Sequence, residues 1–275
     1  KTLKLYVLEA IGDPELMVDI VQLEKNLEAS LTQLKQKFRL SAVKSEFEAE
    51  GASFRDLVRL RRWTARQDIA LHLKIGGMEA IRDIKDALDL GVDGLIAPMV
   101  ESPFGVTKFT EAVGSIFSGR DIYKSINIET RTAVLHIDNI LNEAKGKVEN
   151  VTIGRTDLSN SYFDEEIKPD CEFITNLIRK ISDKVHAVGL TLTVGGSITA
   201  KSINRFKENR ESLEGRIASI ETRKIILPIE SFLEKEHALE EALRFEELYL
   251  RAKLETEKFL SQADQDRLAK LKSRI

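Results

Sequence analysis

Two acidic residues, Glu129 and Asp157, stand near the C-terminal ends of short apolar segments rich in β-branched residues, YKSINIE and NVTIGRTDL. A polar turn and then a helical pattern follow each segment. In an α/β barrel, the C-terminal ends of the strands carry the catalytic side chains. Two carboxylates at neighbouring strand ends supply the oxygen ligands that Mg²⁺ binds. The pair therefore predicts metal-assisted chemistry on a small, anionic, oxygen-rich substrate.

The elements that would position these acids repeat along the whole 275-residue chain. Strand-like and helix-like segments alternate, which predicts a parallel sheet with crossover helices. We expect an α/β fold, a TIM (β/α)8 barrel with a long first helix and an extended C-terminal helical tail. The expected strands span residues 3–10, 41–50, 69–77, 93–100, 123–129, 150–158, 190–196 and 217–227.

Helix signals and the domain division follow from the same pattern. Asp13 and Pro14 mark the start of the long first helix, and Ser53 is the expected cap of the next one. We expect the barrel to occupy residues 1–229. The charged, helix-prone segment 230–275 exceeds one barrel helix, so it either extends the same domain or forms an oligomer contact. Its leucine stripe, together with that of the first helix, predicts a homo-oligomer.

Strand alternation assigns several polar side chains to the barrel interior. Asn127 shares the inner face with Glu129, and Lys74 shares one with His72. Five charged residues are also expected to face inward, namely Lys44, Glu46, Glu48, Glu221 and Arg223. They either form a buried ion network beneath the site or line a solvent-filled site. Unpaired charges in a dry core would cost too much free energy to be tolerated.

Residues at two strand-to-helix turns are candidates for substrate binding, together with Asn127 and Glu48. Gly76 and Gly77 follow the third expected strand, and glycines let a backbone approach a carboxylate or phosphate. Pro98 and Met99 stand at the end of the fourth expected strand, where Pro98 would shape the turn.

The segments PMVES, IET and GRTDLS occur in this order at barrel spacing, after the run KIGGMEAIRDIKDALDLG. Together they resemble the HpcH/HpaI aldolase and citrate lyase β-subunit family, within the phosphoenolpyruvate/pyruvate superfamily of TIM barrels. The resemblance covers roughly residues 40 to 230. It is carried by the combination of the three segments, since any one alone is a weak signal.

The resemblance implies that Glu129 and Asp157 bind Mg²⁺ or another divalent ion such as Mn²⁺. The metal would chelate a 2-oxo acid such as pyruvate and stabilise the enolate formed when a carbon–carbon bond breaks. Lys74 would assist catalysis where many members of the family carry arginine. Arg155 either binds a substrate carboxylate or braces Glu129. The histidine base of the pyruvate aldolases has no clear counterpart here.

The expected function is therefore a divalent-metal-dependent, aldolase-type lyase. One alternative is a citrate-lyase-like acyl-CoA lyase or thioesterase, or a phosphoenolpyruvate-dependent transferase. A further alternative is a catalytically silent barrel used for ligand sensing or assembly. Fold alone does not choose among these possibilities.

The composition indicates which classes of partner and which compartment to expect. The net charge is -3 with a pI near 6.0, which gives no electrostatic case for nucleic acid. No apolar run has the length of a membrane span, and the single cysteine, Cys171, fits a reducing compartment. With no signal-like segment in the sequence, we expect a cytoplasmic protein that contacts neither membrane nor nucleic acid.

Overall fold

The computed structural model describes residues 14–274, with side chains described from residue 20. Residues 34–242 form one compact unit, and the two ends of the chain, before residue 34 and after residue 242, form a second. The strand expected at residues 3–10 and the cap expected at Asp13 lie outside the described residues.

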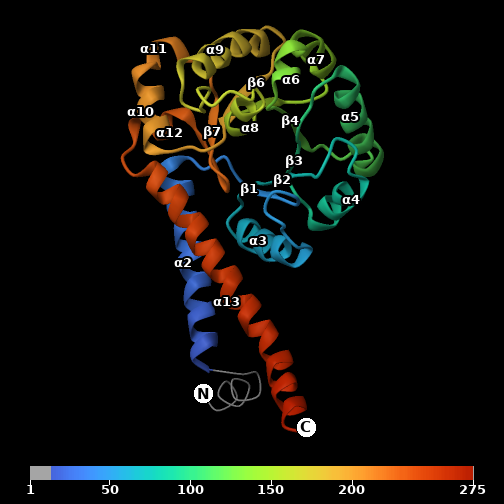
Figure 1. Cartoon of the computed structure of the whole chain (residues 1–275), viewed down its shortest axis with the longest axis vertical. Helices are drawn as coiled ribbons and strands as arrows, with labels where there is room; N and C mark the ends of the chain where they lie inside the picture. Colours follow the sequence, from blue (N-terminus) through green and yellow to red (C-terminus); the bar gives the residue numbers. More distant parts are fainter. Residues whose placement is uncertain (1–13, 275) are drawn as a thin grey trace. The chain divides into compact units, whose positions relative to one another are not determined.

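The first unit is a closed barrel in which eight strands follow one another around the ring in chain order. Figure 1 shows the helices α3 to α12 arranged around this ring. The strands are β1 (Ala42–Glu46), β2 (Leu71–Lys74), β3 (Gly94–Ala97), β4 (Tyr123–Ile128), β5 (Asn150–Gly154), β6 (Thr191–Gly195), β7 (Ser219–Glu221) and β8 (Ile225–Pro228). The expected α/β barrel is therefore confirmed.

The last strand departs from the expected all-parallel arrangement. The segment expected as one strand at 217–227 forms both β7 and β8, and β8 runs antiparallel to β7 and to β1. Only three residues separate the two strands, and a parallel connection needs a crossover of a dozen residues or more. Thr222 closes the turn, since its backbone N–H donates to Ile225 O at 2.8 Å and its hydroxyl accepts from Ile225 N at 3.1 Å.

The helices of the barrel unit follow the expected alternation up to β7. They are α3 (Phe54–Arg66), α4 (Ile81–Leu90), α5 (Pro103–Phe117), α6 (Arg131–Leu135), α7 (Ile137–Ala144), α8 (Arg155–Asn160), α9 (Glu172–Ala187), α10 (Ala200–Glu208), α11 (Arg210–Leu213) and α12 (Ile229–Glu234). Ser53 caps α3 as expected, in a capping box with Asp56.

The apolar and polar faces of the strands are separated as the alternation requires. Leu71 and Leu73 on β2 are fully buried beneath the helices, whereas Lys74 and His72 point the other way. Buried polar side chains line the interior on the other strands too, among them Ser125, Asn127, Asn150, Thr152 and Thr193. Asn150 joins three neighbours here, Ser125, Thr152 and Thr193, through hydrogen bonds of 2.9 to 3.2 Å.

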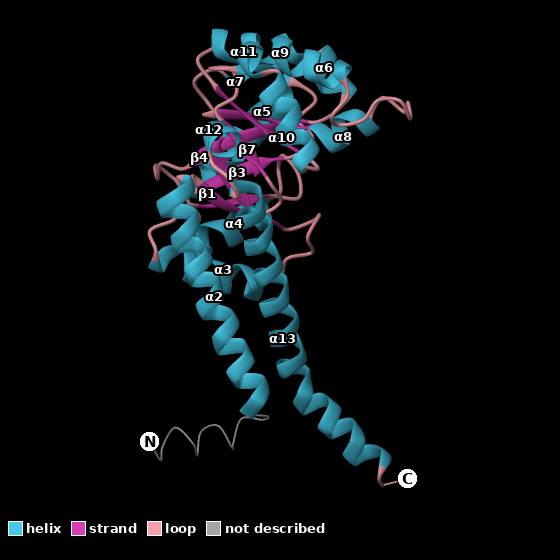
Figure 2. Cartoon of the chain, turned by 90° about the vertical axis from the view of Figure 1, so that its left-hand side faces the viewer, coloured by secondary structure: helices cyan, strands magenta, loops and turns pink. Residues whose placement is uncertain are grey.

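The second unit contains the first part of α2 (Pro14–Phe38) and most of α13 (Ala238–Lys272), which Figure 2 shows as helices. Leu27 and Leu31 on α2 and Phe245 on α13 are fully buried. Other apolar side chains of α13 remain exposed, namely Leu243, Leu250, Leu254, Leu260, Leu268 and Leu271. Among the described helices, none is long and apolar enough to cross a membrane.

Candidate active site at the barrel mouth

Glu129 directly follows β4 and is the most tightly held acid of the site. Its side chain is only 2% exposed. Oε1 accepts a hydrogen bond from the backbone N–H of Met99 at 3.0 Å, and Oε2 accepts one from Asn127 Nδ2 at 3.2 Å. Met99 adopts a left-handed backbone conformation, with φ of 50°, at the turn after β3. Two strand ends therefore fix the orientation of this carboxylate.

The electrostatic environment of Glu129 favours a positive partner. Burial is the main cause that raises its pKa above the ordinary value, and the negative charge of Asp157 raises it further. Lys74 and the N–H of Met99 act in the opposite direction without overcoming burial. A cation placed between the two carboxylates would remove this penalty on ionising Glu129.

Asp157 lies in the first turn of α8, three residues after the end of β5, and not on the strand where it was expected. Gly154 is the last residue of β5, and the backbone turns into α8 immediately after it. The side chain of Asp157 is exposed. Among the described residues, no hydrogen bond or ion pair holds its carboxylate, so both oxygens remain available to a ligand.

Asn127 completes the set of oxygen atoms near Glu129. The side chain is 3% exposed, and its Oδ1 has no hydrogen-bond partner within the described chain. Buried acceptors are rarely left unpaired. The described residues contain no group of three or more His, Cys, Asp or Glu around one point. Two carboxylates with open positions suit Mg²⁺, which keeps several waters and binds one or two carboxylates together with its substrate.

Lys74 begins a chain of alternating charges in the barrel interior. Its Nζ lies 3.4 Å from Glu46 Oε2, and Lys44 Nζ lies 3.2 Å from Glu46 Oε1 and 2.7 Å from Glu221 Oε1. Burial opposes the charged form of Glu46, but Lys44 and Lys74 outweigh it and lower its pKa. These contacts confirm a buried ion network for Lys44, Glu46 and Glu221.

The remaining members of the expected network lie elsewhere. Glu48 is exposed, and its side chain packs on Gly76. The positive charge of Arg223 lowers the pKa of Glu46, but by less than those of Lys44 and Lys74. A second buried pair joins Lys224 to Glu50, with Ser45 Oγ 3.0 Å from Lys224 Nζ. This pair is not predicted from the sequence pattern, although Lys224 stands beside apolar residues that indicate a buried strand.

The two turns proposed for substrate binding differ in what they offer. The N–H of Gly76 donates to Asp83 Oδ2 at 2.7 Å, so it is not free to cradle an anion. Gly77 has open space around its Cα. Pro98 is buried, whereas the side chain of Met99 is 43% exposed. Of these four residues, Met99 contacts Glu129 through its backbone N–H, and its side chain is exposed to solvent.

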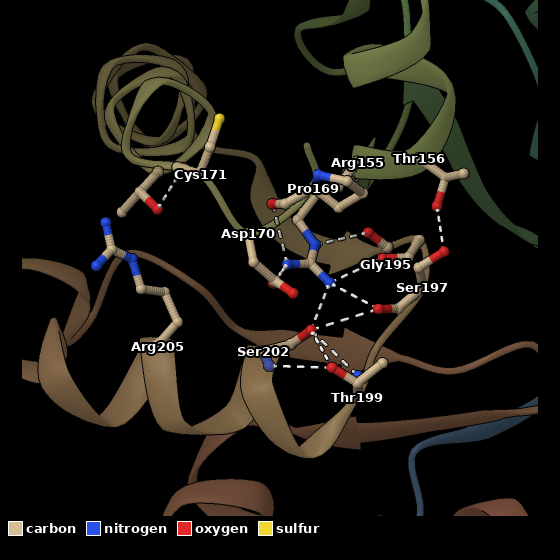
Figure 3. Close-up of polar contacts among 12 residues, drawn as sticks. Arg155, Thr156, Pro169, Asp170, Cys171, Gly195, Ser197, Thr199, Ser202 and Arg205 are labelled. Atoms are coloured by element: carbon tan, nitrogen blue, oxygen red, sulfur yellow. Dashed lines mark hydrogen bonds and ion pairs between the residues drawn. The ribbon is translucent and has the colours of Figure 1, made fainter. Parts of the chain in front are cut away.

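Arg155 takes neither of the roles expected for it. Its side chain is 1% exposed, and none of its described contacts is to Glu129. The guanidinium forms an ion pair with Asp170 at 2.6 Å and donates to backbone oxygens of Pro169, Gly195 and Gly196 (Figure 3). Its donors are engaged within the protein, so Arg155 is not placed to bind substrate.

His72 lies on β2, on the inner face of the barrel. Its ring stacks on that of Tyr123, with centroids 4.6 Å apart, and lies over Gly94 on β3. Burial lowers the pKa of His72 to about 4, with only partial opposition from Asp93. The ring is therefore neutral near pH 7 and has no described contact with the two acids.

Comparisons with known proteins agree with this fold. The family model described as HpcH/HpaI aldolase/citrate lyase matches residues 62–190. No match was found among curated protein sequences.

Solved structures share the fold at low sequence identity. An HpcH/HpaI aldolase from Desulfitobacterium hafniense DCB-2 is 17% identical, with a TM-score of 0.57 over 72% of this chain and 81% of that one. An HpcH/HpaI aldolase/citrate lyase family protein from Burkholderia cenocepacia J2315 is 16% identical, with a TM-score of 0.56 over 80% and 89%. A citrate lyase from Burkholderia xenovorans LB400 is 12% identical, with a TM-score of 0.59 over 87% and 79%.

The matched segment runs from before β2 to after β5 and contains Lys74, Glu129 and Asp157. The family match supports a lyase-type function. Over residues 62–190, within a closed barrel, this chain is similar to the HpcH/HpaI aldolase/citrate lyase family.

Proposed function

We propose that this protein is a divalent-metal-dependent, aldolase-type lyase that acts on a 2-oxo acid through a pyruvate-like enolate. One observation carries the proposal: the carboxylate of Glu129 is buried at the mouth of the barrel. The negative charge of Asp157 disfavours its ionised form, and the positive charge of Lys74 favours it. With a divalent cation bound, such a site would stabilise negative charge that develops in the transition state.

The chain's own residues would have distinct roles in this reaction. Glu129 and Asp157 would hold one Mg²⁺ or Mn²⁺, and Asn127 would orient Glu129 through its 3.2 Å hydrogen bond. The cation would supply Lewis-acid polarisation of the substrate carbonyl. Lys74 would place a second positive charge beside the enolate oxygen, held in place by Glu46 at 3.4 Å. Arg155 has no substrate contact in this scheme.

The test measures metal binding by calorimetry, with Mn²⁺ as titrant and oxalate as a mimic of the pyruvate enolate. Glu129→Gln and Asp157→Asn should each weaken Mn²⁺ binding at least 100-fold while the protein stays folded. Asp138→Asn is the matched control, because Asp138 is an exposed acid whose described partner is Lys184 and not the proposed ligands. Parental Mn²⁺ affinity in Asp157→Asn would contradict the assignment.

A substrate panel then tests the chemistry itself. Cleavage of 4-hydroxy-2-oxo acids that depends on Mg²⁺ or Mn²⁺ is the expected result. Turnover of coenzyme A esters or of phosphoenolpyruvate, without cleavage of 2-oxo acids, would move the protein to another reaction class. Binding of oxalate with no turnover of any compound would indicate a barrel that binds its ligand without catalysis.

A further inference from the structure

Arg155 forms a buried junction between three segments that are separate in sequence. It belongs to the first turn of α8, and its Nη1 lies 2.6 Å from Asp170 Oδ1, just before α9. Its Nη2 donates to Gly196 O at 2.8 Å, on the turn after β6, and to Ser202 Oγ at 3.2 Å, in the first turn of α10. Nε donates to Gly195 O at 3.1 Å (Figure 3).

Although the guanidinium is buried, its N–H groups have hydrogen-bond partners within the protein. One face lies 5.3 Å from the ring of Phe206, and the carboxylate of Asp170 is itself only 15% exposed. A buried ion pair with several added hydrogen bonds holds its geometry, but loss of one partner leaves the other charge uncompensated. The junction therefore depends on both Arg155 and Asp170.

The turn after β6 packs directly on the backbone of α8. Gly196 has φ of 85°, and a Cβ there would lie 2.6 Å from Thr156 N and 2.7 Å from Arg155 N. Thr156 Oγ1 and Ser197 Oγ are 2.8 Å apart across the same contact. No side chain separates the two backbones, so the first turn of α8 rests on this turn.

Asp157 follows Arg155 by two residues, and its carboxylate has no hydrogen bond or ion pair within the described chain. The position of its carboxylate therefore depends on the backbone of α8. We infer that Arg155 and Asp170 are positioning residues that hold the first turn of α8, and with it Asp157, in the geometry for ligand binding. This inference rests on the proposed metal role of Asp157 and adds the residues that maintain it.

The test uses Asp170→Asn and Arg155→Lys, with Glu172→Gln as the matched control. Glu172 lies two residues from Asp170 and pairs at the surface with Arg205 and Arg179, so it shares the α9 and α10 environment but not the junction. In the metal-free protein, both test variants should exchange amide hydrogens faster at residues 155–160 and 195–199. The control should exchange there at the parental rate.

The second measurement is Mn²⁺ affinity by calorimetry. Loss of an outer residue that orients a ligand typically weakens metal binding 10- to 100-fold. Asp170→Asn should show at least a 10-fold loss with an unchanged circular dichroism spectrum, and Arg155→Lys should show a smaller loss because it retains the charge.

Parental amide exchange at residues 155–160 in Asp170→Asn would overturn the inference, as would parental Mn²⁺ affinity in a protein that exchanges faster. If the parent binds no Mn²⁺, the proposed function fails, and the exchange measurement still decides whether the junction orders α8. If Arg155→Lys does not fold, Asp170→Asn provides both measurements alone.

Discussion

The carboxylate of Glu129 lies directly against the Cα of Gly154, across the β4–β5 pair. A methyl group at Gly154 would overlap Oε2 of Glu129 and lie 3.0 Å from its Cβ. Gly154 has an ordinary backbone conformation, with φ of -85°. Glycine is therefore required at this position because a side chain would occupy the space of the Glu129 carboxylate. Its backbone conformation alone would not require glycine.

Gly154→Ala should displace Glu129 while leaving the barrel folded. We expect Mn²⁺ affinity to fall at least 10-fold, as for loss of a residue that orients a ligand, with near-parental circular dichroism. Gly114→Ala is the matched control, because a Cβ at that helical position meets nothing within 4 Å. Calorimetry on both variants checks this, and parental affinity in Gly154→Ala would show that Glu129 does not need its observed position.

Lys74 should act mainly in the transition state, since its charge favours the enolate over the neutral ketone. Lys74→Ala should lower kcat about 100-fold, near 3 kcal/mol, with a smaller effect on oxalate binding. Lys74→Arg should recover part of the activity. Lys108→Ala controls for loss of a lysine outside the ion network, here one paired with Glu79.

Steady-state kinetics on the substrate found in the panel decides the role of Lys74. Full activity in Lys74→Ala would assign this lysine to the interior ion network alone. Trapping of a covalent pyruvate adduct at Lys74 by borohydride would mean a Schiff-base mechanism and would contradict the metal-dependent one.

His72 should make the protein less stable in mild acid. Its pKa is about 4 in the folded protein, below the ordinary value of 6.5, so the unfolded chain binds the proton more tightly. The contribution of His72 to the free energy of unfolding is fully present above pH 6.5 and is lost as the pH falls toward 4. The loss is on the order of 3 kcal/mol. Urea unfolding of His72→Phe, which keeps a ring against Tyr123, should show a correspondingly flatter dependence on pH.

The comparison must separate His72 from the carboxylates that also titrate in this range. The difference in unfolding free energy between parent and His72→Phe, taken at each pH, removes their contribution. His186→Gln, at an exposed position of α9, reports the effect of removing a histidine that is not buried. Parallel curves for parent and His72→Phe would mean that burial of His72 has no energetic consequence.

The exposed leucines of α13 should mediate self-association. Leu250 and Leu254 are 47% and 63% exposed on one helix, and a long helix gains most of its stability by burying an apolar face. Light scattering at micromolar concentration should give a multiple of 31.0 kDa. Leu250→Glu with Leu254→Glu should shift the mass toward one chain, and a parental mass of 31.0 kDa would contradict the prediction.

The sequence by itself determined the features that depend on local pattern. Alternation with a period of two assigned Lys74, Asn127 and Glu129 to the barrel interior, because successive strand side chains point to opposite faces. Ser53 predicted the start of α3, since a cap acts on backbone groups two or three residues away. Glu129 and Asp157 were found from their distance to strand ends and from their match to family segments.

Only the tertiary structure decided the features that depend on barrel closure. The reversal of β8 places it between β7 and β1, which a continuous apolar pattern at 217–227 does not distinguish from one long strand. The partners of Arg155 and of Lys224 come from distant strands and turns, and no local period links residues that meet only when the sheet closes. Two side chains of equal charge, Lys74 and Arg155, thereby have different surroundings. Lys74 lies near Glu129 at the proposed site, whereas Arg155 is buried in a junction with Asp170 and the turn after β6.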